Sequence, residues 1–374
     1  MIQIVQPTLH DFDQVVAEFR QAWDSGQVTT GPFTREFEIA VEQKLAVPHA
    51  IMVQSCTAGL MLVLRALDLE GEAILPAFTW TATAHAAVWN GLRPVFADIV
   101  PGTYTLDPQA AERAITPQTS VLMPVNVFGC PPDYQAFEHL SRKHGLRLVY
   151  DSAQGLGSGY QVSDGSWRYS GNSGDAEIFS LSPTKVVSAM EGGVITTRNP
   201  ALAQKLRQMR DYGKTLDSSD IEWLGLSARV PEINAIVGLH NFNQVDSLIS
   251  QRQALVDAYQ AALTPLPGVT FQKIPATCRS SHNYFTLFIG STEARNSRDT
   301  VYEYLKKQGI QSKKYFYPAL HMQRVYQDLG KPYRGKLPVT EAAAAAGLAL
   351  PLYSHMKLET LEEVCKAVND ILGK

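Results

Sequence analysis

The first half of the chain alternates between short apolar runs and helical stretches, and this alternation constrains the fold more than any other feature. Apolar runs typical of buried strands lie at 50–53, 72–75, 94–97, 121–126 and 146–150. Helical patterns separate several of them, such as the one at 133–144. Strands that alternate with helices form a largely parallel sheet with helices on both faces. The sequence therefore predicts an α/β fold.

Small, hydroxylated or charged residues follow the carboxyl ends of these runs, at 55–58, 76–83 and 151–154. In open α/β sheets, ligands bind at that edge. The segment 55–58 also opens a helix, whose first N–H groups and dipole attract anions, although an ordinary Ser/Thr helix cap gives the same pattern. We therefore expect a ligand site at this edge.

Lys185 lies on a loop between two β-rich runs, in Ser180-Leu-Ser-Pro-Thr-Lys185, and Glu191-Gly-Gly follows it. Taken alone, the stretch favours an ordinary solvated lysine. The alternative is a lysine that forms Schiff bases, which requires desolvation or nearby cations to lower its pKa.

The end of the chain has a different pattern. A long helical stretch at 245–263 runs into Thr264-Pro-Leu-Pro-Gly268, which is typical of a domain junction. A strand is expected at 283–289 and an amphipathic closing helix from Leu358. We predict a large domain at 1–245, with an N-terminal arm at 1–32, and a small α+β domain at 246–374.

Composition excludes several classes of function. The chain has 33 Lys and Arg against 36 Asp and Glu, without a basic block, so no nucleic-acid partner is expected. No apolar run is long enough for a membrane span, and the start lacks a signal-peptide pattern. The four cysteines are scattered and show no CxxC spacing, so neither a metal site nor a disulfide framework is expected. A cytoplasmic protein is expected.

Four segments, in this order, resemble the DegT/DnrJ/EryC1/StrS family of sugar aminotransferases. They are Ser55-Cys-Thr57-Ala-Gly-Leu60, Pro76-Ala-Phe-Thr-Trp80-Thr-Ala-Thr83, Asp151-Ser-Ala-Gln154, and Ser180-Leu-Ser-Pro-Thr-Lys185 with Glu191-Gly-Gly. The resemblance covers nearly the whole chain. It implies the aspartate aminotransferase fold (fold type I), with a mostly parallel seven-stranded sheet between helices, and pyridoxal 5'-phosphate (PLP) as cofactor.

The resemblance also implies the role of each cofactor contact. Lys185 would form the internal aldimine and then move the proton, while Asp151 would pair with the pyridine nitrogen, which keeps the ring an electron sink. Gln154 would lie near the 3-hydroxyl group, and Trp80 would stack on the ring. The phosphate would bind at the helix start, and the residues expected there are Cys56, Thr57, Ala58 and the hydroxyl of Ser180.

A second subunit completes the phosphate site in many members of the family, usually through Asn in an N-x-R pattern. This chain has Ser227-Ala-Arg229 there, so Ser227 would make a shorter contact. A shared site implies at least a homodimer. Asn126 and Phe128 replace the His and Tyr of many members and suggest altered substrate contacts. Further candidates for substrate contacts are Arg229 and His321, and then Thr29, Thr30 and Tyr317.

The sequence thus predicts a PLP-dependent transaminase that moves an amino group, expected from L-glutamate, to a keto group of a nucleotide-linked deoxy sugar. The mechanism would be ping-pong, with pyridoxamine phosphate as the stored form. The alternatives are a keto-cyclitol or a keto sugar without a nucleotide as acceptor, or a non-enzymatic regulatory protein with this fold. An NAD(P) enzyme is disfavoured, because the glycines at 155–159 lack the G-x-G-x-x-G spacing.

Overall fold

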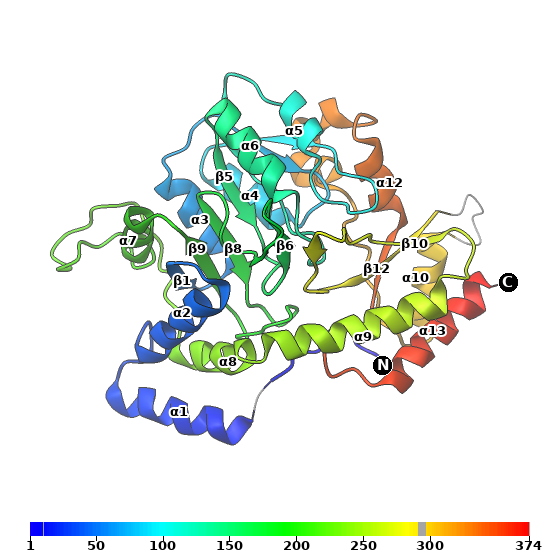
Figure 1. Ribbon diagram of the computed structural model, residues 1–374, viewed down its shortest axis with the longest axis horizontal. Coiled ribbons are helices and arrows are strands. Elements are labelled where there is room, and N and C mark those ends of the chain that lie inside the picture. The colour runs from blue at the N-terminus through cyan, green and yellow to red at the C-terminus, as the bar shows by residue number, and fades with distance from the viewer. Residues whose placement is uncertain (10, 291–296, 374) are drawn as a thin grey trace.

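A seven-stranded sheet forms the centre of the computed structural model, which describes residues 1–9, 11–290 and 297–373. The strand order is β1-β9-β8-β5-β4-β2-β3 (Figure 1). Strand β9 runs antiparallel to both of its neighbours, and the other neighbouring pairs are parallel. The predicted mostly parallel seven-stranded α/β sheet is confirmed. Its strands are β1 (His49–Val53), β2 (Glu72–Pro76), β3 (Arg93–Ala97), β4 (Thr119–Leu122), β5 (Arg147–Asp151), β8 (Ala176–Ser180) and β9 (Gly193–Thr197).

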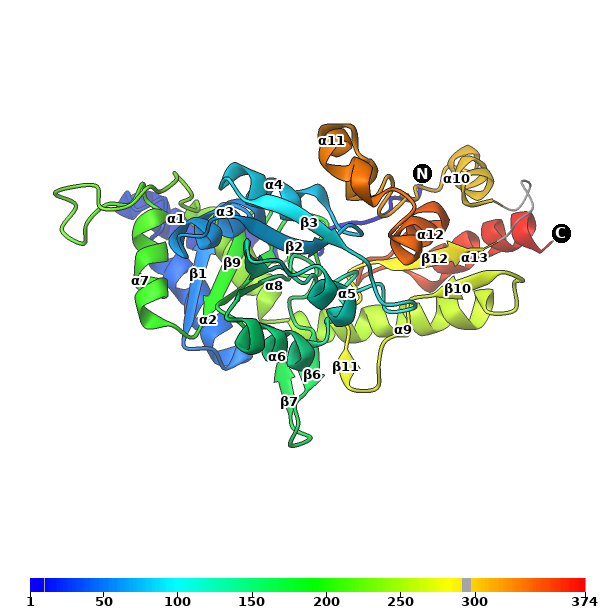
Figure 2. The same ribbon diagram turned by 90° about the horizontal axis from the view of Figure 1, so that it is seen from above.

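Helices cover both faces of the sheet (Figure 2). Apolar side chains that alternate along each strand divide between two layers, so that Ile51 and Val53 pack on one face and Met52 on the other. The first face carries α3 (Cys56–Ala66), α4 (Thr81–Trp89) and α7 (Pro200–Met209). The second face carries α2 (Pro32–Leu45), α5 (Pro108–Arg113), α6 (Tyr134–His144) and α8 (Glu232–Phe242).

A second core lies in the C-terminal part of the chain. An antiparallel sheet of β10 (Val269–Phe271), β12 (Phe285–Ile289) and β13 (Gly347–Leu350) packs with α9 (Val245–Leu263), α10 (Arg298–Lys307) and α13 (Leu358–Leu372). Helix α9 begins at the predicted domain boundary and runs from the large sheet to α13 (Figure 1). The boundary itself stays a prediction.

Shorter elements complete the fold. They are α1 (Phe12–Ser25), α11 (Gln327–Gly330), α12 (Pro338–Ala346), the 3-10 turns η2 (Leu320–Met322), η3 (Arg324–Tyr326) and η4 (Lys331–Tyr333), and a small sheet of β6 (Gly159–Gln161), β7 (Trp167–Tyr169) and β11 (Cys278–Arg279). No helix within the described ranges is long and apolar enough to cross a membrane.

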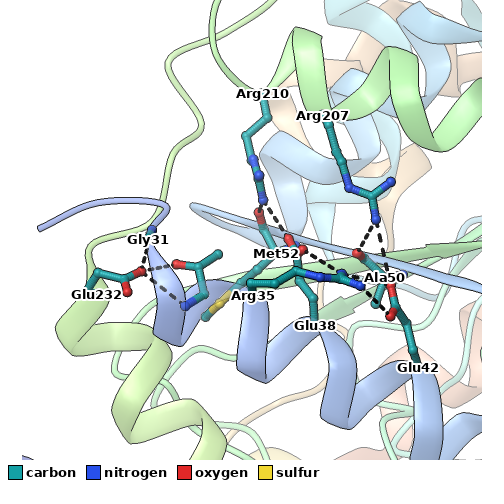
Figure 3. Close-up of polar contacts among 10 residues, drawn as sticks. Gly31, Arg35, Glu38, Glu42, Ala50, Met52, Arg207, Arg210 and Glu232 are labelled. Carbon is teal, nitrogen blue, oxygen red and sulfur yellow. Dashed lines mark hydrogen bonds and ion pairs between the residues drawn. The ribbon is translucent and has the colours of Figure 1, made fainter. Parts of the chain in front are cut away.

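Side chains occupy the backbone groups along the open side of the edge strand β1 (Figure 3). Glu38 accepts from the amide of Met52 at 2.9 Å, and Arg210 donates to the carbonyl of Met52 at 2.7 Å. Glu42 accepts from the amide of Ala50, and Arg207 donates to the carbonyl of Ala50. Side chains from helix α2 and from the C-terminal end of α7 thus satisfy the backbone donors and acceptors of β1 that a further strand would otherwise pair with.

The buried centre of this network is the Glu38–Arg210 ion pair. The two side chains are 3% and 9% exposed and lie 2.7 Å apart. A buried charge is tolerated when it is paired and its remaining polar atoms are hydrogen-bonded, and the β1 backbone supplies those bonds. The pair therefore clamps helices from opposite faces onto one edge strand.

Glu232 holds the start of α2 from a distance in sequence. Its carboxylate accepts from the amide of Gly31 at 2.8 Å (Figure 3). It also accepts from the amides of Phe33 at 2.7 Å and Thr34 at 3.1 Å, and from the Thr34 hydroxyl. An anion at a helix N-terminus satisfies the free N–H groups and the dipole. The contact ties the start of α8 to the helix that carries Glu38.

We expect Arg210→Met to lower the free energy of unfolding by about 3–5 kcal/mol, because Glu38 would lose its buried counter-ion and keep only the half-exposed Arg35. Urea unfolding monitored by circular dichroism measures the change. Arg35→Met is the matched control, since Arg35 is 49% exposed and also pairs with Glu38 and Glu42. Its effect should stay within about 1 kcal/mol, and equal losses in the two variants would contradict the assignment.

Candidate active site

One cavity of about 280 Å³ brings most of the predicted site residues together at the edge of the sheet. It lies where β5 and β8 end and where α3 and α4 begin. The predicted residues that line it are Cys56, Thr57, Trp80, Asp151, Gln154, Ser180 and Lys185. The C-terminal part of the chain closes it with Tyr284, Lys313, Tyr315 and Phe316. A larger groove of about 1220 Å³ follows α9 and contains none of the predicted site residues.

Asp151 forms a buried floor at the end of β5. It is 3% exposed, the Thr83 hydroxyl donates to its Oδ2 at 2.6 Å, and the Ala153 amide donates to its Oδ1 at 3.1 Å. Burial raises the pKa of Asp151, while these two hydrogen bonds and the charge of Lys185 act in the opposite direction. A cation placed against this carboxylate would favour its ionised form.

Lys185 extends into the cavity from a turn fixed on both sides. The Lys185 amide donates to the Ser182 carbonyl at 3.0 Å, and the next amide, that of Val186, donates to Asn283 Oδ1 at 3.2 Å. Lys185 Nζ lies 5.8 Å from the centre of the Tyr284 ring. Burial alone would raise the pKa of Tyr284, but the Lys185 charge and hydrogen bonds with Thr184 and Tyr315 outweigh it, so that this pKa is lowered.

The first turn of α3 is the predicted binding site for an anion. The Ser55 hydroxyl caps the helix by accepting from the Ala58 amide at 3.1 Å, and Cys56 and Thr57 line the cavity. The first N–H groups of a helix have no intrahelical partner. A Cβ atom on Gly193 would lie only 2.6 Å from the Cys56 nitrogen, so glycine lets β9 approach this turn. Burial raises the pKa of Cys56 well above its usual value.

Aromatic rings form one wall of the cavity. Trp80 is 56% exposed although it is large and apolar, and its ring lies edge-on to Tyr315, with centroids 6.4 Å apart. The Tyr315 and Tyr284 centroids are 4.9 Å apart. Gln154 Oε1 accepts from the Phe128 amide at 2.6 Å, which fixes the Gln154 side chain against the wall. The cavity therefore offers flat apolar surface beside its charged groups.

Several predicted site residues do not line this cavity. Ala58 follows the lining residue Thr57, and Ser55 occupies its amide. Ser227 and Arg229 lie at the base of the 211–227 loop, where Arg229 forms an ion pair with Asp211. This loop projects from the body of the molecule after α7 (Figure 1).

His321 is fully buried, 3.2 Å from Glu341, beside the ring of Phe96. The lower-ranked candidates Thr29 and Thr30 pair with the segment before α8, and Tyr317 packs under Arg298.

Asn126 and Phe128 are packed behind the cavity and do not line it, and their effect on substrate contacts stays a prediction. Asn126 is fully buried and donates to the hydroxyls of Ser152 at 2.6 Å and Tyr134 at 3.2 Å. Phe128 stacks on Phe316, with centroids 5.3 Å apart. The structure therefore gives these side chains a packing role in the wall.

Sequence reasoning missed several residues of the site. The sequence could have indicated Thr83, because it follows Trp80 by three residues at the start of a helix and therefore lies at the same edge of the sheet. Tyr284 and Lys313 had none, because they come from strands and loops far along the chain that only the tertiary fold brings to the cavity.

A buried carboxyl lies next to the floor of the site. Glu177 is fully buried, and it accepts from the Tyr134 hydroxyl at 2.8 Å, the Ser152 hydroxyl at 3.0 Å and the Ser173 amide at 3.0 Å. Burial raises its pKa from 4.5 to about 7, although these hydrogen bonds oppose the shift. Its strand neighbour Ile178 pairs with Asp151.

We expect stability to fall as pH rises from 4.5 to about 7, because the unfolded chain loses the Glu177 proton before the folded chain does. The Glu177→Gln variant lacks this titration. Its free energy of unfolding relative to the parent should therefore rise by roughly 3 kcal/mol between pH 4.5 and about pH 8. Urea unfolding of the cofactor-free proteins at both pH values measures this. A difference that stays constant with pH would contradict the burial argument.

Comparison with known proteins connects this cavity to a chemistry. The model of the DegT/DnrJ/EryC1/StrS aminotransferase family matches residues 11–369. The dTDP-4-amino-4,6-dideoxy-D-glucose transaminase of Shigella dysenteriae is 30% identical over 371 residues, which cover 99% of each chain. The crystal structure of DesI in the presence of its TDP-sugar product is similar with a TM-score of 0.87 and 34% identity, over 97% of this chain and 90% of that one.

The PLP-form of a Streptococcus pneumoniae protein assigned as a sugar aminotransferase is also similar. Its TM-score is 0.88 at 25% identity, over 98% of each chain.

Proposed function

The chain belongs to the DegT/DnrJ/EryC1/StrS aminotransferase family, and from that membership we propose that it transfers an amino group to a keto group of a nucleotide-linked deoxy sugar with PLP as cofactor. The observation that carries the proposal is the arrangement of Lys185 and Asp151. An amine and a buried carboxylate line one cavity, and the start of α3 lies at the same place.

The residues fit PLP in several respects. Asp151 is a buried carboxylate with a raised pKa, and a cationic ring nitrogen would stabilise its charge. The first turn of α3 fits a phosphate, with Ser180 beside it. The exposed face of Trp80 fits a flat ring. Lys185 would hold the aldehyde of the cofactor, and Gln154 lies on the same wall.

Bound PLP supplies an electron sink for the pair of electrons left when a substrate carbon loses its proton. The chain supplies the proton transfers and the orientation. Lys185 Nζ would take the proton from the amine-bearing carbon of the donor and deliver one to the acceptor carbon. Asp151 would keep the proton on the ring nitrogen, and Thr83 would hold the Asp151 carboxylate in place.

The relatives support a sugar nucleotide as acceptor. One is named as a transaminase of a dTDP-linked dideoxy sugar, and the DesI structure contains a TDP-sugar product. We infer a sugar nucleotide of this class as acceptor and L-glutamate as donor, used in two successive half-reactions. A keto-cyclitol and a keto sugar without a nucleotide remain the alternative acceptors.

We infer further that two copies of the chain share their sites. Ser227 and Arg229 lie outside the cavity of their own chain, at the base of the projecting 211–227 loop. That loop exposes large apolar side chains, Leu216 at 78% and Leu224 at 71%. Apolar residues exposed together mark an interaction surface. A second copy would cover them and place Ser227 at the phosphate end of its neighbour's cavity.

Purified protein loaded with PLP should be yellow, and L-glutamate should bleach the colour. Lys185→Ala should be colourless and should lose at least roughly a thousandfold in transfer rate, because both the nucleophile and the proton carrier are gone. Absorbance spectra and turnover with a panel of nucleotide-linked keto sugars measure this. Lys366→Ala, an exposed position on α13, is the control. Unchanged colour and turnover in Lys185→Ala would refute the assignment.

Mixing two inactive variants tests the shared site. Ser227→Asp places a like charge beside the phosphate and should block cofactor binding in the neighbouring subunit. Random mixing with Lys185→Ala should then restore about a quarter of the parental activity, since half the dimers are mixed and each of these has one intact site. An active Ser227→Asp protein, or a mixture without recovery, would contradict sharing.

A further inference from the structure

Lys313 is a second lysine of the active-site cavity, and nothing in the mechanism above uses it. It lines the same cavity as Lys185. Its Nζ lies 5.2 Å from the centre of the Tyr315 ring. Within the described part of the chain, no carboxylate forms an ion pair with it. Lys313 is exposed where it lines the cavity, and an ammonium group beside a ligand cavity without a protein counter-ion is free to pair with an anionic group of the ligand.

The backbone at Lys313 is held firmly. Its amide donates to the Ala349 carbonyl at 3.0 Å, and the Ala349 amide donates back to the Lys313 carbonyl at 2.7 Å. Ala349 belongs to β13, which lies in the C-terminal sheet. The side chain therefore starts from a fixed point beside the cavity, which reduces the conformational freedom to be lost when it binds a ligand.

The next residue shows the contrast. Lys314 forms an ion pair with Asp299 at 2.8 Å, lies over the ring of Tyr302, and is not part of the cavity wall. The two consecutive lysines thus differ in their surroundings. Lys314 pairs with a carboxylate of the protein, whereas Lys313 lines the active-site cavity.

The charge of Lys313 also acts inside the site. Together with Lys185, it lowers the pKa of the buried Tyr284 hydroxyl, although burial opposes this. Lys185 Nζ lies 5.8 Å from the centre of the Tyr284 ring and Lys313 Nζ lies 5.2 Å from the centre of the Tyr315 ring, and the two ring centroids are 4.9 Å apart. Each ammonium group thus lies near a different ring of this pair, so we expect an anion at Lys313 and the carbon that reacts at Lys185 to be different parts of one substrate.

We propose that Lys313 binds an anionic oxygen group that the substrate carries several bonds away from its reacting carbon. This rests on the proposed function, which gives the cavity two anionic substrates in turn. The group is either the distal carboxylate of the amino donor or the diphosphate of the sugar nucleotide. Both offer oxygen acceptors to an ammonium group.

The test uses the cofactor-loaded enzyme and two unreactive probes. Glutarate carries the two carboxylates of the donor without its amine, and thymidine diphosphate carries the diphosphate without the sugar. Isothermal calorimetry measures the affinity of each probe for the parent, Lys313→Met, Lys313→Arg and the control Lys314→Met. Urea unfolding and the cofactor absorbance verify that each variant is folded and loaded.

We expect Lys313→Met to bind one or both probes roughly 10- to 100-fold more weakly, the range for a lost hydrogen bond to a charged group. Lys313→Arg should restore most of the affinity, and Lys314→Met should match the parent. A loss of affinity for glutarate alone assigns the anionic group to the amino donor, and a loss for thymidine diphosphate alone assigns it to the acceptor. A loss for both probes indicates that Lys313 binds both substrates in turn.

The proposal is overturned if Lys313→Met binds both probes as the parent does, if Lys314→Met loses as much, or if the parent binds neither. Failure of the proposed function has a different signature, because the parent enzyme itself would then transfer no amino group to any sugar nucleotide of the panel.

Discussion

The buried ion pair between Glu38 and Arg210 sets the geometry on which the site depends. It joins a helix from each face of the sheet to strand β1, and α3 begins three residues after that strand ends. The position of β1 therefore fixes the first turn of α3, and Gly193 fixes how closely β9 approaches that turn. A charge pair in the scaffold thus helps to determine where the proposed anion-binding turn lies.

Both parts of the chain are needed to build the cavity. The large sheet supplies Asp151 and the Lys185 turn, and the C-terminal part supplies Asn283, which accepts from the amide next to Lys185. Behind Asn283 is Arg252, a buried arginine of α9 that donates to the carbonyls of His282 and Asn283. The long helix therefore stabilises the segment that contacts the turn of Lys185, the lysine proposed to be reactive.

The sequence allowed the sheet and one side of the site to be predicted, because strand ends and helix starts are local features. Asp151, Lys185 and the turn at Ser55 each follow a run whose periodicity is visible over a few residues. The opposite side could not be predicted in this way. Tyr284 and Lys313 reach the cavity through tertiary packing, and the burial of Asn126 behind the cavity wall could not be foreseen, because residue identity alone does not tell which side of a wall a side chain faces.

The hydrogen bonds along β1 also determine how this molecule can associate with others. An open edge strand is a template on which another chain can add a strand and start aggregation. Here the donors and acceptors of Ala50 and Met52 are already occupied by Glu38, Glu42, Arg207 and Arg210. Continuous sheet growth across this edge is thereby blocked, so copies of the chain cannot associate by adding a strand to β1.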